Sequence, residues 1–324
     1  MKKNRITLII STHNRPYNVL KIINCLQKQV NFTKSYEIII CGSSFEDRLK
    51  IGSYIKNFIN LEILYLNSRI NHQAHKRNFA AQKASGEYLI FIDDDCFPNN
   101  KFYFNHYNLL KINKKKTIYC GAVEYIKNIK NSNLIKYRND RLISHNNLNS
   151  INISEKNFIS MNMSVSKNIF LNNKYLFDNR FRFYGFEDFE FAYRFLNKGY
   201  KVMLSKALVM HQDFRSLNDY LNKCTALVEG LEDIKKINLD AAKKSIFYKI
   251  KENTLIKLIL KIPFIYQFLD SLIKIIIFLE KKIFFYCPFL YKIGIFLSFL
   301  KGLKVKFSPQ RQYNYLLKSN NWYK

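Results

Sequence analysis

Four short and almost uninterrupted apolar runs recur through the first hundred residues of the chain. They are RITLIIS (5–11), YEIIICG (36–42), LEILYLN (61–67) and EYLIFID (87–93), and helix-like stretches separate them. Continuous rather than alternating apolar sequence indicates strands buried on both faces, and a strand–helix–strand rhythm is typical of a parallel sheet. The first half of the chain is therefore predicted to form a doubly wound α/β sheet.

The middle of the chain continues this pattern less regularly. TIYCGAVEYI (117–126) and KVMLSKALVMH (201–211) are predicted strands, and EDFEFAYRFLNKG (187–199) is a predicted helix that ends at Gly199. These segments complete the sheet, so we predict one α/β domain over residues 1–239.

From about residue 240 the sequence changes to lysines interleaved with Ile, Leu, Phe and Tyr. Residues 240–324 hold 16 Lys and Arg against 4 Asp and Glu, and charges interrupt every apolar run. A simple transmembrane helix is therefore disfavoured. Basic apolar helices suit the surface of an anionic membrane, whereas the alternative is packing on the core or on a second subunit of a homo-oligomer. We predict that 240–324 forms such a helical region.

Composition excludes several classes of protein. The 324 residues are 48% hydrophobic, which excludes a disordered chain, and 24% charged, which excludes a protein with many membrane spans. Six scattered cysteines show no zinc-like spacing, and the apolar run near the N-terminus is too short for a signal peptide. A cytoplasmic location is therefore expected. The net charge of +29 favours partners that carry phosphate.

Three consecutive carboxylates end the fourth predicted strand, in FIDDDCFP. Ligands of such sheets bind beyond the carboxyl ends of the strands. Side chains two apart in a strand point the same way, so Asp93 and Asp95 are predicted to share one ligand while Asp94 faces elsewhere. A hard divalent cation completed by diphosphate oxygens fits this pattern. The alternative is an acidic helix N-terminus.

A second acidic pair, Glu187 and Asp188, follows a glycine at the start of a predicted helix. A buried carboxylate beside a second one has a raised pKa and suits a general base. The alternative is an acidic first turn of a surface helix, with Glu190 and Arg194 as an ion pair four residues apart.

Together these residues resemble the inverting family 2 glycosyltransferases of the GT-A fold, of the kind that builds bacterial surface polysaccharides such as capsule or lipopolysaccharide. The resemblance covers about residues 5–215, and its elements occur in order. They are ITLIISTHNRP, HKRNFAAQKASGEYLIFIDDDCFP with the DxD motif, ISMNMSVSKNIFLNNKYLFDNRF, GFEDFEFAYRFLNKGYK with the ED motif, and ALVMHQD.

The resemblance implies a site for a nucleoside-diphosphate sugar. Thr12, Asn14 and Arg15 would line the nucleotide pocket, and Arg77 would lie near the diphosphate. Two further donor-binding residues are implied, Ser43 and Asp94.

The resemblance also implies a metal and a base. Asp93 would contact the ribose or the metal, Asp95 would bind Mn²⁺ or Mg²⁺, and His211 would be a further ligand. Asp188 would deprotonate the acceptor hydroxyl, with Glu187 as the second candidate. Transfer would then invert the anomeric configuration in one displacement.

One feature departs from the family. After the second strand the family has a pair of acidic residues, one of which reads the uracil ring, whereas this chain has CGSS at 41–44. UDP is the expected nucleotide, with Ser43 or Asp47 as a substitute reader, and a donor with another base stays open. His72 and His75 are expected to be solvated or phosphate-facing, without a catalytic role.

The predicted function is metal-dependent transfer of a sugar to a glycan or lipid-linked glycan, at the inner face of the cell membrane. A sugar nucleotidyltransferase is the second hypothesis, but STHNRP lacks the glycines of its usual loop. A third is a non-enzymatic basic protein that binds lipid or nucleic acid. It leaves the acidic clusters unexplained, because they would repel a phosphate backbone, so no nucleic-acid partner is expected.

Overall fold

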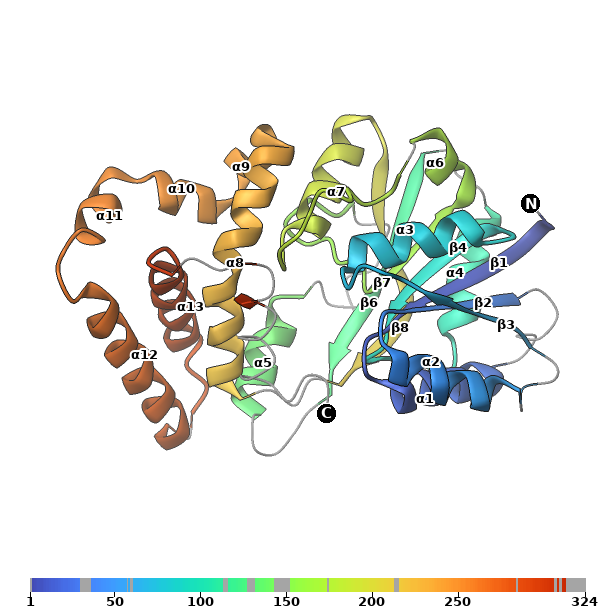
Figure 1. The fold of residues 1–324 in the computed structure, drawn as a ribbon, viewed down its shortest axis with the longest axis horizontal. Coiled ribbons are helices and arrows are strands. Elements are labelled where there is room, and N and C mark those ends of the chain that lie inside the picture. The colour runs from blue at the N-terminus through green and yellow to red at the C-terminus, as the bar shows by residue number, and fades with distance from the viewer. Residues whose placement is uncertain are drawn as a thin grey trace.

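The computed structural model of the chain describes residues 2–29, 36–56, 58, 61–112, 116–126, 132–142, 152–173, 175–212, 216–283, 285–305, 308 and 311–312. A twisted sheet occupies one side of the molecule, and helices from the C-terminal part of the chain lie beside it (Figure 1). The strands are β1 (Lys2–Ser11), β2 (Tyr36–Gly42), β3 (Glu62–Asn67), β4 (Gly86–Asp93), β5 (Cys96–Pro98), β6 (Thr117–Tyr125), β7 (Asn162–Ser166) and β8 (Lys201–His211).

The strand order is β3-β2-β1-β4-β7-β6-β8-β5. The first four strands pair in parallel, as predicted, and β7 is antiparallel to both β4 and β6. The chain reaches β2 and β3 on one side of β1 and returns to β4 on the other. The carboxyl ends of β1 and β4 therefore form a topological switch point, the usual ligand-binding position of such sheets.

Helices cover both faces of the sheet, which explains the continuous apolar runs of β1, β2 and β4. They are α1 (Pro16–Gln27), α2 (Phe45–Ile55), α3 (Gln73–Lys83), α4 (Phe102–Lys111), α5 (Ser132–Asp140), α6 (Lys167–Asn172) and α7 (Glu187–Asn197). In β1, Leu8 and Ile10 pack in the same core as Ile22 of α1, whereas Ile9 packs in the core that contains Ala80 of α3. Successive β1 residues thus fill two different cores.

The predictions for two strands need correction. The run at 61–67 was predicted to be buried on both faces, yet β3 is an edge strand whose Leu64 is 41% exposed. β7 was not predicted as a strand, because it carries Asn162 and Ser164 in the middle of the sheet. These polar groups are satisfied by the buried His106, whose ring nitrogens each lie 2.8 Å from one of their oxygens.

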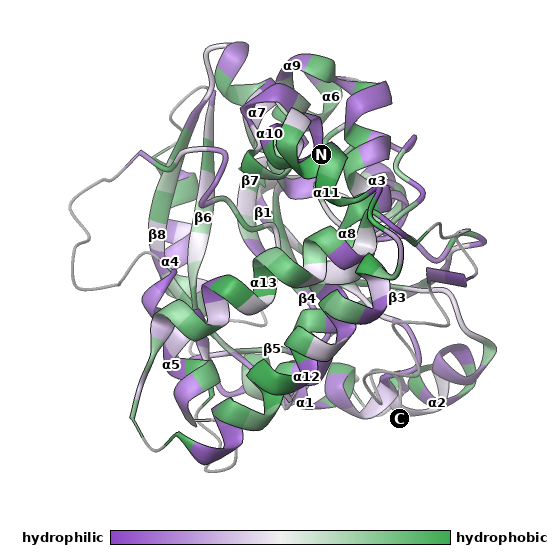
Figure 2. Cartoon of the chain, turned by 90° about the vertical axis from the view of Figure 1, so that its left-hand side faces the viewer, coloured by the Kyte–Doolittle hydropathy of each residue, from purple (hydrophilic) through white to green (hydrophobic). Residues whose placement is uncertain are grey.

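The C-terminal helices form a second layer against the sheet domain. They are α8 (Leu217–Ile237), α9 (Leu239–Lys244), α10 (Ile246–Glu252), α11 (Thr254–Ile259), α12 (Ile265–Lys282) and α13 (Pro288–Gly302), and Figure 2 shows this side of the molecule. Leu221 of α8, Ile276 of α12 and Tyr291 of α13 share one buried cluster. Within the described ranges, none of the helices combines the length and the apolar character needed to cross a membrane. A domain division at residue 239 stays a prediction.

Candidate active site

The candidate site lies where β1 and β4 end side by side. Ser11 of β1 pairs with Asp93 of β4, so the residues that follow the two strands meet. The Thr12 hydroxyl donates to Asp94 at 2.9 Å, and the main-chain N–H of His13 lies 3.3 Å from the same carboxylate oxygen. Burial raises the pKa of Asp94 to about 6, and the nearby Arg15 opposes that shift.

Arg15 joins two of the three consecutive carboxylates. Its Nη1 atom lies 3.0 Å from Asp94 and 2.8 Å from Asp95. The prediction that Asp93 and Asp95 share a ligand while Asp94 faces elsewhere is wrong for this structure. β4 ends at Asp93, so strand alternation does not extend to the turn that holds the next two residues. The cation bound by Asp93 is Arg77, at 2.7 Å.

Asp95 and His211 form the pair from which a metal site can be built. Strand β5 pairs with β8, and this brings the Nε2 atom of His211 to 3.3 Å from Oδ1 of Asp95, while Arg15 binds Oδ2. Cys96 lies in the same cluster, and burial raises the pKa of its thiol well above its usual range. One carboxylate and one imidazole fit Mn²⁺ better than Mg²⁺, which prefers an all-oxygen shell. Their role as ligands stays a prediction.

The loop after β1 is held by a carboxylate with no such role in the prediction. Asp47 is fully buried and accepts the N–H groups of Asn14 at 2.6 Å and Arg15 at 2.9 Å. Asn14 has a φ of 55°, a strained value for a residue with a side chain, and these bonds stabilise it. Asp47 therefore positions the loop, and both of its oxygens are used in doing so. The hydroxyl of Ser43, the other proposed substitute for the base-reading acid, lies 2.9 Å from Nδ1 of His13, and its role in reading the base stays a prediction.

Lys76 is a site residue that the sequence analysis missed. It is 1% exposed, and its ammonium group donates to the carbonyl of Thr12 and to the Asn71 side chain, at 2.8 Å each. Burial lowers its pKa to about 8. A lysine within a helix is ordinarily solvated, so only its place next to Arg77 in HKRN could have indicated this position.

Arg77 links the strand-end carboxylates to the acidic pair of α7. It is 3% exposed, and besides its bond to Asp93 its Nη1 atom lies 3.7 Å from Asp188. Glycine and phenylalanine in left-handed conformation, Gly185 and Phe186, precede α7 and place Asp188 in its first turn.

Asp188 has the environment expected of a base. Ser160, which is fully buried, donates both its hydroxyl and its main-chain N–H to the carboxylate, the latter at 3.1 Å. Burial raises the pKa of Asp188 to about 6, with Arg77 opposing and Glu187 reinforcing the shift. Burial likewise raises the pKa of Glu187, whose Oε2 atom has no hydrogen-bond partner among the described residues. Asp188 is thus the better-supported candidate for the base.

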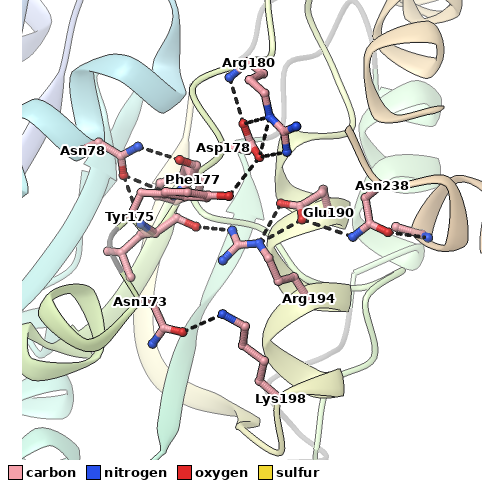
Figure 3. A network of polar contacts seen from close by, with 12 residues as sticks. Asn78, Asn173, Tyr175, Phe177, Asp178, Arg180, Glu190, Arg194, Lys198 and Asn238 are labelled. Atoms are coloured by element: carbon pink, nitrogen blue, oxygen red, sulfur yellow. Dashed lines mark hydrogen bonds and ion pairs between the residues drawn. The ribbon is translucent and has the colours of Figure 1, made fainter. Parts of the chain in front are cut away.

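The ion pair that the alternative reading predicted for α7 is also present. Arg194 lies 2.9 Å from Glu190 and donates to the carbonyl of Leu176, so the pair ties α7 to the segment before it (Figure 3). His72 and His75 are not the solvated or phosphate-facing residues that we expected. Their Nε2 atoms bond to the carbonyls of Phe183 and Asn179, at 3.3 and 2.8 Å.

Known proteins resemble the chain in sequence and in fold. The family model described as glycosyl transferase family 2 matches residues 7–172, about half of the chain. The chain is 27% identical over 99 residues to the poly(ribitol-phosphate) beta-N-acetylglucosaminyltransferase TarS of Staphylococcus aureus, and likewise to the glycosyltransferase AglE of Haloferax volcanii. Each match covers 30% of this chain, but only 17% of TarS and 32% of AglE.

The whole described fold has a counterpart among solved structures. The crystal structure of S. aureus TarS 1-349 in complex with UDP aligns with a TM-score of 0.54 and 14% identity, over 93% of this chain and 90% of that one. The likeness confirms the predicted GT-A fold. Asp188 and His211 lie beyond the residues that the family model matches, so their roles stay predictions.

Replacing Arg77 should destabilise the protein strongly. Arg77→Met leaves Asp93 and Asp188 without their buried cation, which is expected to cost about 3 kcal/mol of unfolding free energy. Lys235→Met, which breaks a solvent-exposed pair with Glu252, should cost less than about 1 kcal/mol. Urea unfolding of both variants measures the difference, and equal losses would show that the Arg77 pairs add nothing special.

Proposed function

The chain belongs to glycosyl transferase family 2 and is a glycosyltransferase, and we propose that it moves a sugar from a nucleoside-diphosphate sugar to a hydroxyl of a glycan or lipid-linked glycan. The observation that carries this proposal is the buried Arg77, which bonds to Asp93 and faces Asp188. It joins the strand-end carboxylates of the donor side to a carboxylate that suits a base. Family membership removes the two alternative hypotheses, a sugar nucleotidyltransferase and a non-enzymatic basic protein.

The proposed donor is a UDP-sugar. Its support is the fold shared with TarS, which has been crystallised with UDP, together with the polar loop residues Thr12, His13 and Arg15 at the end of β1, where His13 contacts Ser43. Asp95 and His211 would hold the divalent cation, which would neutralise charge on the departing diphosphate. Arg15 and Lys76 bring positive charge to the same end of the sheet, next to Asp94.

In the proposed reaction Asp188 accepts the proton of the acceptor hydroxyl while that oxygen attacks the anomeric carbon. The sugar–phosphate bond breaks on the opposite face, and the electron pair leaves with the nucleoside diphosphate. Ser160 holds the carboxylate in place for this transfer, and Arg77 stabilises its charged form. Because one displacement occurs, the anomeric configuration inverts.

Two carboxylate variants separate donor binding from proton transfer. Asp95→Asn should abolish both transfer and metal-dependent UDP binding. Asp188→Asn should lower kcat by about 10²- to 10⁴-fold, the usual contribution of a general base, with UDP affinity nearly unchanged. Isothermal titration with UDP and Mn²⁺ gives the affinities, and loss of UDP binding in both variants would contradict the division of roles.

Transfer should also decline below about pH 6, because Asp188 must be ionised to accept a proton. Ser160→Ala removes a hydrogen bond to the charged carboxylate, which raises its pKa, so the decline should begin at a higher pH. Thr12→Val likewise removes a hydrogen bond to the charged carboxylate of Asp94 and raises its pKa, which burial already raises to about 6. The measurement is kcat against pH, and a profile that moves only in Thr12→Val would assign the decline to Asp94.

We further propose that the C-terminal helices bind an anionic membrane. Large apolar side chains are exposed along α11 to α13. These helices lie on the side of the molecule that faces the viewer in Figure 2. They include Leu255, Leu258, Phe264, Phe268, Phe278 and Phe289. An extended exposed apolar surface is typical of a contact with a protein or a membrane.

On helix α12 the exposed apolar side chains lie on a different side of the helix from the buried ones. Ile265, Leu269 and Ile276 of one apolar stripe are buried. Phe268 and Phe278, ten residues apart, lie on another side of the helix and are each 58% exposed. α12 thus has one apolar stripe for the protein and another for a partner.

The charge of the whole C-terminal region favours lipid as that partner. α12 itself carries three lysines, but also Asp270 and Glu280, and Lys274 lies 2.9 Å from Asp270. Residues 240–324 together hold 16 Lys and Arg against 4 Asp and Glu, and lysine stems next to apolar side chains suit anionic headgroups. A membrane surface would bring a lipid-linked acceptor to the enzyme. All six cysteines are free, which agrees with a cytoplasmic face.

Membrane binding should depend on the exposed phenylalanines of α12. The double variant Phe268→Asp, Phe278→Asp should bind phosphatidylglycerol-containing vesicles at least about tenfold more weakly, because it lacks two aromatic side chains that would insert into the lipid. The matched control is Phe104→Asp on α4, where the phenylalanine is 61% exposed, and its binding should be unchanged. Sedimentation with vesicles measures both. Unaltered vesicle binding with a change in oligomeric state would assign the surface to a second copy of the chain.

A further inference from the structure

Three side chains of α3 hold the main chain of the segment between α6 and α7. His72, His75 and Asn78 recur at intervals of three residues, so they share one face of the helix. Their partners are, in the same order, Phe183 O at 3.3 Å, Asn179 O at 2.8 Å, and both the N–H of Phe177 at 3.1 Å and its carbonyl at 2.6 Å. The segment therefore runs antiparallel to α3, held at three points along its length. Figure 3 shows the contact made by Asn78.

The hydrogen-bond pattern identifies the tautomer of His72. Its Nδ1 atom accepts the N–H of Ala74 at 3.2 Å and so caps α3. The proton must therefore be on Nε2, which donates it to the carbonyl of Phe183. Burial lowers the pKa of His72 to about 4, so this neutral form persists at neutral pH.

A carboxylate of α8 holds the same residue from another direction. Asp233 is 3% exposed, and its Oδ2 atom accepts the N–H groups of Arg182 at 2.7 Å and Phe183 at 2.9 Å. The two polar groups of the Phe183 main chain are thus bonded to side chains from two helices distant in sequence. Phe183 has little freedom to move relative to either helix.

The residues after Phe183 are equally constrained. A Cβ at Gly230 of α8 would lie 2.4 Å from the carbonyl oxygen of Tyr184, so only glycine permits this approach. The Tyr184 N–H donates at 2.9 Å to Gln312, whose side chain donates in turn to the carbonyl of Ala226 at 2.7 Å. α7 begins three residues after Tyr184.

We propose that His72 and Asp233 are positioning residues for Asp188, acting through the main chain of Phe183. Four residues separate Phe183 from Asp188, and two of them, Gly185 and Phe186, have left-handed backbone that fixes the start of α7. A displacement of Phe183 therefore moves the carboxylate of Asp188. Misplacement of a reacting group by about 1 Å can lower a rate by about 100-fold. The inference rests on the proposed role of Asp188 as the base.

Two replacements of His72 separate its two hydrogen bonds. Asn is a good N-cap residue but too short to reach Phe183, so His72→Asn keeps the cap and loses the contact. Gln places an amide nitrogen near the position of Nε2, so His72→Gln keeps the donor to Phe183. We expect kcat to fall by about 10- to 100-fold in His72→Asn and to be largely preserved in His72→Gln, with the donor KM unchanged in both.

For Asp233 the matched control is on the same helix. Asp233→Ala should lower kcat over the same range and speed amide hydrogen exchange in the segment 182–188. Asp219→Ala removes the capping box with Ser216 at the far end of α8, and it should reduce stability without changing kcat or exchange in that segment.

The outcomes decide between positioning and a general structural role. Equal losses of kcat in His72→Asn and His72→Gln, or in Asp233→Ala and Asp219→Ala, would overturn the proposal. Two measurements separate this result from a failure of the proposed function: sugar transfer by Asp188→Asn, and hydrogen exchange in Asp233→Ala compared with the wild type. If Asp188→Asn transfers sugar normally, the base assignment is wrong, whereas faster exchange confined to 182–188 in Asp233→Ala would still show that Asp233 holds the segment.

Discussion

The site depends on the balance of charge at the end of one buried strand. β4 supplies Asp93, Asp94 and Asp95 in succession, and carboxylates so close together and so little solvated repel one another. Two guanidinium groups meet them, Arg15 from the loop after β1 and Arg77 from α3. Both can do so because β1 and β4 are neighbours in the sheet. The position of β1 next to β4 in the sheet is therefore needed for the charge of these carboxylates to be neutralised.

The same balance connects the two halves of the proposed reaction. Arg77 contacts both Asp93 and Asp188, so the charges on the donor side influence the ionisation of the carboxylate proposed as the base. Asp94 and Asp188 lie on either side of this arrangement, and burial raises the pKa of each. A charged donor bound at the proposed site would therefore alter the ionisation of both carboxylates.

Local patterns in the sequence predicted what local physics decides. The apolar runs that became β1, β2 and β4 are recognisable because both of their faces are covered, and the acidic start of α7 follows a glycine. β7 was not predicted because its polar side chains are satisfied by a histidine 56 residues away. The positions of Lys76 and Asp47 were not predicted because their hydrogen-bond partners lie in other loops. The sharing of a ligand by Asp93 and Asp95 failed because the strand ends one residue too early for alternation to hold. Resemblance placed Asp95 and His211 together, which no local pattern could have done.

The three-point attachment of residues 176–183 to α3 has a consequence for divergence among related chains. Surface loops ordinarily accept insertions and deletions readily. Here His72 and His75 bond to main-chain atoms, and Asn78 bonds both to the main chain of Phe177 and to the side chain of Asn179. Exposed side chains of the segment other than Asn179 can therefore be exchanged without disturbing these contacts. The length of the segment cannot change, because one residue more or fewer would put every later contact out of register with the helix. Relatives that retain this arrangement should therefore differ in the composition of the loop while keeping the number of its residues constant.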